Sequence, residues 1–178
     1  MNRSILVTGV SGSGKSAVCE ELNNSGNVAF DIERIPGLFK NIHRDTGKVV
    51  EYFGGSDLNL AKQHDWICDK GKLISLINEN SNGIVYYCGV ATNLDEIIPM
   101  FDKVFLLVAG EKETRERLTH RTSNNYGRTP EVQDWIFTWK ERLEKHIIDQ
   151  GAEVIDANQD LRKVVDDIIK KSTISLEC

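Results

Sequence analysis

The sequence of 178 residues predicts an α/β fold, a three-layer α-β-α sandwich built on a five-stranded parallel sheet. Two observations support this fold. Five short apolar runs alternate with segments of helical periodicity, which is the pattern of strands that are covered by helices on both faces. The first run leads directly into a glycine-rich turn at residues 9–16, which is followed by a helical segment. In such sheets ligands bind beyond the carboxyl ends of the strands, so we expect the site there.

The expected strands are short apolar runs at residues 5–8, 28–31, 84–88, 103–109 and 152–156. Apolar residues at helical spacing predict helices over residues 16–23, 58–80, 111–121, 130–149 and 161–171, and a short helix from Thr92 or Asn93 to Pro99. Gly71 marks a break within the 58–80 segment, and Pro130 suits the first turn of the helix that it opens. Residues 32–57 contain Pro36 and several glycines, so we expect irregular structure there.

The composition is that of a single globular domain over residues 1–178. A formal net charge of −5 argues against a broad nucleic-acid surface and against binding to an anionic membrane. No apolar run approaches the roughly 20 residues of a membrane span, and no signal peptide precedes the first strand. The four cysteines are scattered without a C-x-x-C pair, which favours a reduced cytoplasm over a disulfide framework or a zinc site. The oligomeric state stays open.

Residues 9–16 match the complete phosphate-loop pattern G-x-x-x-x-G-K-[ST]. Its glycines allow the backbone to curl so that several N–H groups point at one anion, and the following helix adds its positive dipole end. Lys15 supplies a mobile charge for the outer phosphates of a nucleoside triphosphate, and the Ser16 hydroxyl suits Mg²⁺. The residues expected to bind the nucleotide here are Gly9, Ser11, Gly12, Ser13, Gly14, Lys15, Ser16 and Ala17.

An acidic residue, Asp31, ends the second expected strand and therefore reaches the same edge of the sheet. Next to a phosphate loop its carboxylate can hold Mg²⁺ through water, orient an acceptor hydroxyl or accept the proton of that hydroxyl. The alternative is a solvated strand-end acid, or an ion pair with Arg34. We favour the catalytic and metal-supporting role for Asp31, and the role of Glu33 stays open.

Arginines are concentrated near a polar loop, although the chain as a whole is acidic. Arg121 opens this loop and Arg128 closes it, while Arg117 lies four residues before Arg121 on the same helix face. Guanidinium groups bind phosphate oxygens in a fork, and a flexible loop flanked by arginines suits a closing lid. The alternative is a set of surface ion pairs, which fits Arg115 with Glu111. We expect Arg121 and Arg128 to act in catalysis.

A last polar segment, residues 155–160, follows the fifth strand and opens onto the same edge of the sheet. Its small and polar residues could surround the edge of a base with backbone groups. The alternative is an ordinary helix cap at Asn158 or Asp160.

These motifs occur together in an order that resembles the small-molecule and nucleoside monophosphate kinases of the P-loop superfamily, such as the adenylate, cytidylate, shikimate and gluconate kinases. The matching segments are residues 9–16, Arg117-Leu118-Thr119-His120-Arg121, Gly127-Arg128 and Ile155-Asp156-Ala157-Asn158-Gln159. The resemblance implies a P-loop NTPase fold, ATP as donor with Mg²⁺, and a mobile lid at about residues 121–130. It further implies that Arg117 lies near the adenine, that Arg121 and Arg128 touch phosphates, that Asn158 and Gln159 help to bind the base, and that residues 32–80 bind the acceptor.

Two features depart from that family pattern. The third strand ends in Cys88-Gly89 and lacks the usual acid that supports Mg²⁺, so Asp31 is expected to replace it. The helix after the lid carries Trp135, Trp139 and Lys140 where nucleotide kinases tend to place another arginine. The candidates for acceptor binding are Arg34, His43, Arg44, His64, Asp65 and Trp66, although Trp66 also suits the core of an amphipathic helix.

We therefore expect an ATP-dependent kinase that transfers the γ-phosphoryl group to a small metabolite or nucleotide. Lys15, the loop amides, Mg²⁺ on Ser16 and the lid arginines would stabilise the transferring group, and Asp31 would position or deprotonate the acceptor. The alternative is a regulatory P-loop ATPase, or a nucleotide-binding protein, without a small-molecule acceptor. The partner expected for the kinase is a small-molecule phosphoryl acceptor, which the sequence does not identify.

Overall fold

A computed structural model describes residues 2–51, 55–122 and 124–173, and its centre is a parallel sheet of five strands. The strands are β1 (Arg3–Thr8), β2 (Val28–Asp31), β6 (Ile84–Cys88), β7 (Lys103–Val108) and β8 (Glu153–Asp156). Their order across the sheet is β2-β6-β1-β7-β8, so β1 lies in the middle. The prediction of a five-stranded parallel sheet is confirmed.

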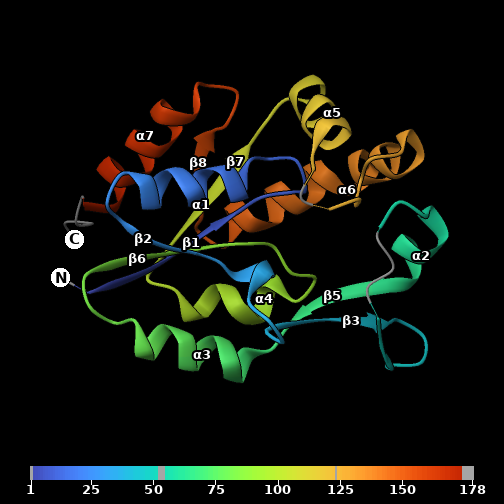
Figure 1. Cartoon of the computed structure of the whole chain (residues 1–178), viewed down its shortest axis with the longest axis horizontal. Helices are drawn as coiled ribbons and strands as arrows, with labels where there is room; N and C mark the ends of the chain where they lie inside the picture. The colour runs from blue at the N-terminus through green and yellow to red at the C-terminus, as the bar shows by residue number, and fades with distance from the viewer. Residues whose placement is uncertain (1, 52–54, 123, 174–178) are drawn as a thin grey trace.

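Helices cover both faces of this sheet and complete the three predicted layers (Figure 1). On one face lie α1 (Lys15–Asn24) and α7 (Leu161–Thr173), whose buried residues share one core cluster with alternate strand residues. On the other face lie α3 (Lys70–Glu79), α4 (Leu94–Ile97) and α6 (Pro130–Asp149), which share a second cluster. The remaining helix, α5 (Glu111–His120), follows β7 and leads into the loop that was expected from the sequence to be a lid.

Strand alternation decides which side chains enter which cluster. In β6, Tyr86 packs with α1 and α7, while its neighbour Tyr87 packs into the opposite cluster. In the central strand β1, Ile5 and Leu6 divide in the same way, and both are fully buried. Because all five strands are parallel, their carboxyl ends meet at one edge, where β1 runs into the phosphate loop.

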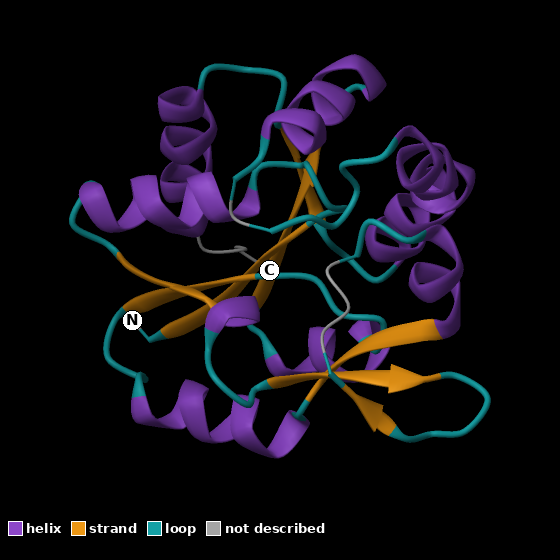
Figure 2. Cartoon of the chain, turned by 45° about the vertical axis from the view of Figure 1, so that its right-hand side comes forward, coloured by secondary structure: helices purple, strands orange, loops and turns teal. Residues whose placement is uncertain are grey.

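Residues 32–80 differ from the prediction. A 3₁₀ turn (Ile32–Arg34) leads into a second, antiparallel sheet with the order β4-β3-β5. Its strands are β3 (Phe39–His43), β4 (Val49–Val50) and β5 (His64–Cys68), and α2 (Leu58–Gln63) precedes β5. This small sheet projects beside α2, away from the main sheet (Figure 2).

The prediction of a single helix over residues 58–80 was therefore wrong, and the expected break at Gly71 lies inside α3. His64, Trp66 and Cys68 alternate with Asp65 and Ile67, which is the period of a strand. This short alternation was hidden between two stretches of helical spacing. The backbone N–H and C=O groups of this segment pair with those of β3. That partner cannot be inferred from the segment itself.

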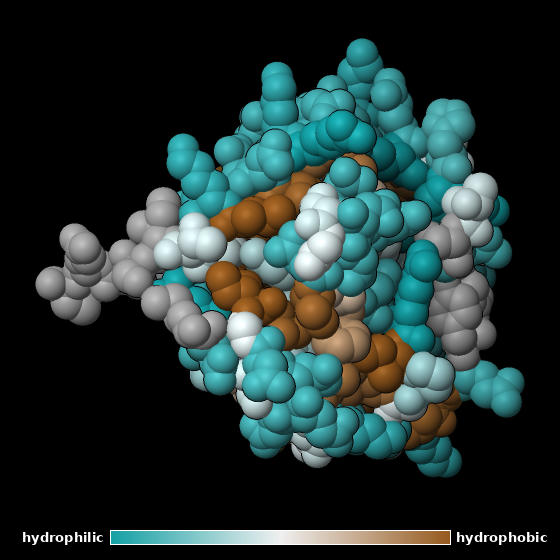
Figure 3. Space-filling model, turned by 60° about the vertical axis from the view of Figure 1, so that its left-hand side comes forward, coloured by the Kyte–Doolittle hydropathy of each residue, from teal (hydrophilic) through white to brown (hydrophobic). Residues whose placement is uncertain are grey.

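One side of the molecule is shown in Figure 3. Most of it is hydrophilic, and apolar side chains gather in patches across its middle. Among the described residues, no helix combines the length and the apolar character that crossing a membrane requires.

The two neighbouring tyrosines of β6 provide a matched test of the core. The Tyr87 hydroxyl is buried and has no hydrogen-bond partner among the described residues, whereas the Tyr86 hydroxyl shares a hydrogen bond with Ser172. Because an unpaired buried hydroxyl is unfavourable, we expect Tyr87→Phe to raise the free energy of unfolding by about 1 kcal/mol. Tyr86→Phe should lower it by about the same amount. Urea denaturation of both variants measures this; destabilisation by Tyr87→Phe would contradict the expected packing.

Candidate active site

The phosphate loop joins β1 to α1 and depends on glycines with positive φ. Gly12 has φ +85°, and a Cβ there would lie 2.9 Å from Leu118 Cγ and 3.0 Å from Thr114 Cγ2 of α5. Gly14 has φ 105° and is the N-cap residue of α1. A side chain is unfavourable in this backbone region. The glycines therefore allow the loop to curl closely against α5 at the start of α1, where an anion would bind.

Lys15 lies across the inside of this loop. Its ammonium donates hydrogen bonds to the carbonyl oxygens of Gly9, at 2.8 Å, and Val10, at 3.1 Å. The residue is only 8% exposed. Burial lowers the pKa of Lys15, and the nearby Glu33 carboxylate counteracts part of this change. The charge is thus held in a weakly solvated position, where it can act strongly on a phosphate.

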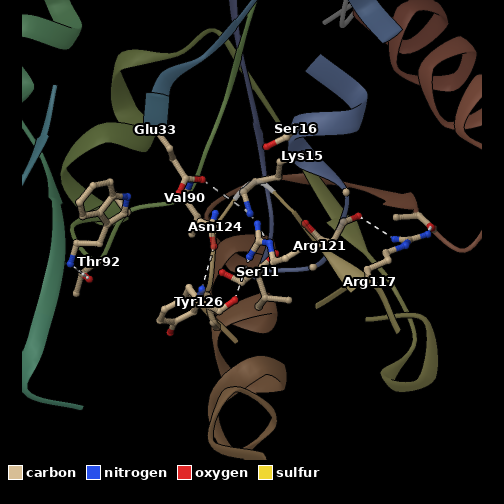
Figure 4. A pocket seen from close by; sticks show the side chains of 18 of the residues that line it. Ser11, Lys15, Ser16, Glu33, Val90, Thr92, Arg117, Arg121, Asn124 and Tyr126 are labelled. Atoms are coloured by element: carbon tan, nitrogen blue, oxygen red, sulfur yellow. Dashed lines mark hydrogen bonds and ion pairs between the residues drawn. The ribbon is translucent and has the colours of Figure 1, made fainter. Parts of the chain in front are cut away.

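The carboxylate that approaches Lys15 is Glu33, whose role the sequence left open. Glu33 Oε1 lies 4.0 Å from Lys15 Nζ and accepts a hydrogen bond from the Val90 backbone N–H at 3.0 Å. Burial raises the pKa of Glu33, while Lys15 and the Val90 N–H oppose the change. The signal in the sequence was the acidic pair Asp31-x-Glu33 directly after a strand. Figure 4 shows Glu33 extending toward Lys15.

Asp31 lines the same pocket, but its carboxylate also forms an ion pair with Arg34 at 3.3 Å. The position of Asp31 is thus compatible with a role in supporting Mg²⁺ or catalysis and with the alternative of an ion pair with Arg34. Ser16 also lines the pocket, so a hydroxyl and a carboxylate face one cavity. This oxygen donor set suits Mg²⁺, which usually takes one or two protein ligands and completes its shell with phosphates and water. Among the described residues no cluster of three metal-binding side chains occurs.

Arg117 connects the phosphate loop with the loop after β8. Its guanidinium donates to the Ser13 carbonyl at 3.2 Å and to the Ala157 carbonyl at 2.8 Å. Arg121, one turn further along, lines the pocket and donates to the Tyr126 carbonyl at 3.2 Å. Figure 4 shows both arginines beside the phosphate loop. From the sequence, Arg117 and Arg121 were expected to lie together at this end of the pocket.

Other predicted residues lie differently. Arg128 is not among the residues that line the pocket; its guanidinium Nε donates to the Arg121 carbonyl at 3.1 Å. Asn158 is also outside the lining, because its side chain accepts from the Gly110 N–H at 2.7 Å. Gln159 does line the pocket. The catalytic role of Arg128 and the nucleotide-binding role of Asn158 stay predictions.

One pocket of about 1350 Å³ extends from the phosphate loop to the small sheet. This exceeds the range of roughly 300–1,000 Å³ typical for one small ligand. The sequence suggested Arg34, Arg44, His64 and Trp66 for its outer part, and all four line it; His43 and Asp65 do not. Sequence reasoning missed Asn41, Thr92 and the face of α6 that carries Trp135, Thr138, Trp139 and Arg142.

The lid loop contacts the region expected to bind the acceptor. The Gly127 N–H donates to the Gly55 carbonyl at 3.3 Å, and the Thr129 hydroxyl donates to the Ser56 carbonyl at 3.2 Å. On α6, the buried Gln133 amide donates to the Gly127 carbonyl at 3.0 Å. These bonds connect the loop to the segment before α2 and to α6.

The parallel sheet, the curled glycine loop at the end of its central strand and the buried lysine define a P-loop protein. A family described as AAA domain matches residues 5–149, and the chain belongs to this family. A comparison with curated protein sequences gives no significant match.

Solved structures of several kinases have similar folds. Deoxyadenosine kinase from M. mycoides with bound dATP is 17% identical, with a TM-score of 0.61, covering 95% of this chain and 98% of that one. A gluconokinase from Sinorhizobium meliloti is 21% identical, with a TM-score of 0.52, covering 96% of this chain and 91% of that one. A sugar kinase from a Janibacter species is 14% identical, with a TM-score of 0.53, covering 96% of this chain and 94% of that one. At these identities the likeness establishes the fold.

Two glycines with similar backbone angles test the phosphate loop. Gly12→Ala places a Cβ against Leu118 and Thr114, so the loop must move from α5 and its amides must turn. We expect Gly12→Ala to weaken Mg·ATP binding by at least about tenfold, a loss of roughly 1.4 kcal/mol.

The control is Gly26→Ala, which has φ +81° but no atom within 4 Å of the added Cβ. It should destabilise the fold by about 1–2 kcal/mol through the left-handed backbone alone and leave the affinity unchanged. Isothermal calorimetry on folded protein measures both affinities. Equal losses of affinity in the two variants would argue against a specific role of the loop.

Proposed function

We propose that the protein is a Mg²⁺-dependent kinase that transfers the γ-phosphoryl group of ATP to a hydroxyl group of a small molecule. The observation that carries this proposal is the position of Glu33, whose carboxylate lies 4.0 Å from Lys15 inside the pocket. The three structures of similar fold named above are a deoxyadenosine kinase, a sugar kinase and a gluconokinase, which supports the same class of reaction.

The carboxylate favours a hydroxyl over a phosphate as the acceptor. An alcohol must lose a proton when it attacks phosphorus, and a carboxylate within hydrogen-bond reach can accept that proton. A phosphate acceptor is already ionised near neutral pH, so it needs no base, and its negative charge would be repelled by Glu33. This argument narrows the expectation of a metabolite or nucleotide acceptor to molecules that offer a free hydroxyl.

In the reaction, the acceptor oxygen forms a bond to the γ-phosphorus while the bond from that phosphorus to the β,γ-bridging oxygen breaks. The hydroxyl proton passes to Glu33, and ADP leaves. Lys15 and the amides of the phosphate loop stabilise the charge on the outer phosphates, and Arg121 adds its charge from the lid side. Asp31 and Ser16 would hold Mg²⁺, which neutralises charge on the β- and γ-phosphates when bound. Arg117 would lie beside the adenine.

The pocket also bears on the alternative of a regulatory ATPase. Hydrolysis needs space for only a water molecule beside the γ-phosphate. The pocket instead continues past Glu33 to Asn41, Trp66 and α6, and its volume of about 1350 Å³ leaves room for a second ligand. We assign this outer part, within residues 32–80 and α6, to the acceptor, and residues 121–130 to the lid.

Glu33→Gln tests the proposed base. We expect kcat to fall by about 10²–10⁴-fold, the usual contribution of general base catalysis, with little change in ATP affinity. In the wild-type protein the rate should fall as pH decreases, because protonated Glu33 cannot accept the proton. Since its pKa is raised, this decline should be centred above the ordinary value of 4.5.

The variant should lose this acidic decline. The matched control is Glu20→Gln, an exposed position on α1. Stopped-flow or coupled ADP assays across pH measure the profiles. An unchanged profile in Glu33→Gln would exclude Glu33 as the base.

The function itself is tested by ADP release in the presence and absence of acceptors. Purified protein with Mg·ATP should release ADP slowly alone and faster with one of a panel of nucleosides, sugar acids and polyols. Lys15→Ala should abolish turnover while the thermal unfolding transition confirms that it folds. Equal ADP release with and without every acceptor would favour the regulatory ATPase. Full activity of Lys15→Ala would refute the kinase assignment.

A further inference from the structure

One polar side chain in the outer part of the pocket is nearly buried and lacks a partner. Asn41, in the middle of β3, is only 7% exposed and lines the pocket. Within the described ranges its side-chain amide makes no hydrogen bond. The amide is not one of the fully enclosed polar groups that lack a partner, so it is reached from the pocket that it lines. A ligand that enters the pocket can therefore pair with it.

The neighbour of Asn41 is an aromatic ring that also lines the pocket. Asn41 is directly opposite Trp66 in the antiparallel pairing of β3 with β5, so the two side chains project from the same face of the small sheet. Phe39 stacks on the Trp66 ring with centroids 5.1 Å apart and an interplanar angle of 23°. The indole is thus supported from one side and presented beside an unpaired amide.

The loop that follows β6 holds the backbone of Trp66 near the proposed base. The Thr92 hydroxyl accepts a hydrogen bond from the backbone N–H of Trp66 at 3.0 Å, and the backbone N–H of Thr92 donates to the Trp66 carbonyl at 2.7 Å. Two residues earlier, the Val90 N–H donates to Glu33. Figure 4 shows Glu33, Val90 and Thr92 along one wall of the pocket. One short segment therefore contacts both the Glu33 carboxylate and the strand that carries Trp66.

We propose that Asn41 and Trp66 form a recognition site for the base of a nucleoside, whose sugar hydroxyl is the phosphoryl acceptor. This inference rests on the proposed kinase function. A planar heterocycle stacks on Trp66, and the Asn41 amide offers one donor and one acceptor side by side. It matches a ring edge that presents an acceptor next to a donor, as adenine does.

Two of the arginines that line the outer part of the pocket already have carboxylate partners, and a third, Arg142 of α6, lines the same part. A sugar acid would need a cationic group, which Arg142 would supply, so gluconate is the competing acceptor in the test. Arg34 is paired with Asp31, and Arg44 Nε donates to Asp65 Oδ1 at 2.8 Å. An uncharged ring with a polar edge requires no such group. The buried amide and the supported indole account for the chemistry of this wall without breaking either ion pair.

The test compares adenosine, cytidine, uridine and guanosine with gluconate and glycerol as acceptors. Binding is measured by tryptophan fluorescence without ATP, and transfer by acceptor-dependent ADP release. We expect the nucleosides to quench fluorescence and to accept the phosphoryl group, and gluconate and glycerol to do neither. Trp66→Leu should weaken nucleoside binding by at least about tenfold, because stacking of one base contributes that much or more.

A change of hydrogen-bonding pattern at Asn41 separates recognition from packing. Asn41→Asp keeps the shape but offers two acceptors, which fit the paired N–H donors of guanine and not the edge of adenine. We expect the ratio of kcat/KM for guanosine over adenosine to rise by at least about tenfold, within the range that base-edge pairing discriminates. Asn78→Asp, an exposed asparagine on α3, is the matched control. Asn41→Ala, checked by thermal unfolding, covers the case in which the charged variant does not fold.

The outcomes separate the two proposals. If gluconate or glycerol stimulates ADP release and no nucleoside binds, the recognition site is refuted and the kinase stands. If nucleosides quench the fluorescence with affinities whose preference depends on Asn41, but no acceptor stimulates ADP release, recognition of the base stands and the kinase is refuted. An unchanged nucleoside preference in both Asn41 variants would also overturn the role of Asn41.

Discussion

The approach of Lys15 to Glu33 is the interaction on which the candidate site depends. Lys15 belongs to the loop after the central strand, and Glu33 to the turn after an edge strand, so the parallel sheet brings them together. Each charge is held by backbone groups, the carbonyls of Gly9 and Val10 for the ammonium and the Val90 N–H for the carboxylate. Burial lowers the pKa of Lys15 and raises the pKa of Glu33, which favours the neutral form of each group. The attraction between the two charges opposes both shifts.

This arrangement explains the division of the pocket. On one side of the Lys15–Glu33 pair, the phosphate loop, Arg117 and Arg121 present cationic and N–H groups that suit a polyphosphate. On the other side the wall is made by the small sheet and α6, where Trp66, Trp135 and Trp139 lie with Asn41, Arg44 and Arg142. A transferring phosphoryl group would pass between these two regions, next to the pair. The loop that ends at α6 hydrogen-bonds to Gly55 and Ser56 in the segment before α2, which joins the two regions.

Local signals predicted the phosphate loop and its place at the end of the central strand. The glycines, Lys15 and Ser16 lie in one short segment, and chain continuity fixes their relative positions before any tertiary contact forms. The acceptor end could not be predicted in the same way. Asn41 and Trp66 are far apart in the sequence and meet only through the pairing of β3 with β5. The prediction of a helix through Trp66 failed for this reason, and it concealed the strand that places the ring in the pocket.

The sequence by itself determined the parallel sheet, the layered helices and the phosphate loop, because apolar periodicity and a contiguous glycine motif are local properties of the chain. Only the tertiary structure decided which acid approaches Lys15, since Asp31 and Glu33 are separated by one residue and differ in which way the 3₁₀ turn directs them. It also decided that Arg117 joins two loops while Arg128 binds the Arg121 carbonyl outside the pocket lining. These outcomes depend on side-chain directions at the meeting point of distant segments, which spacing along the chain does not specify.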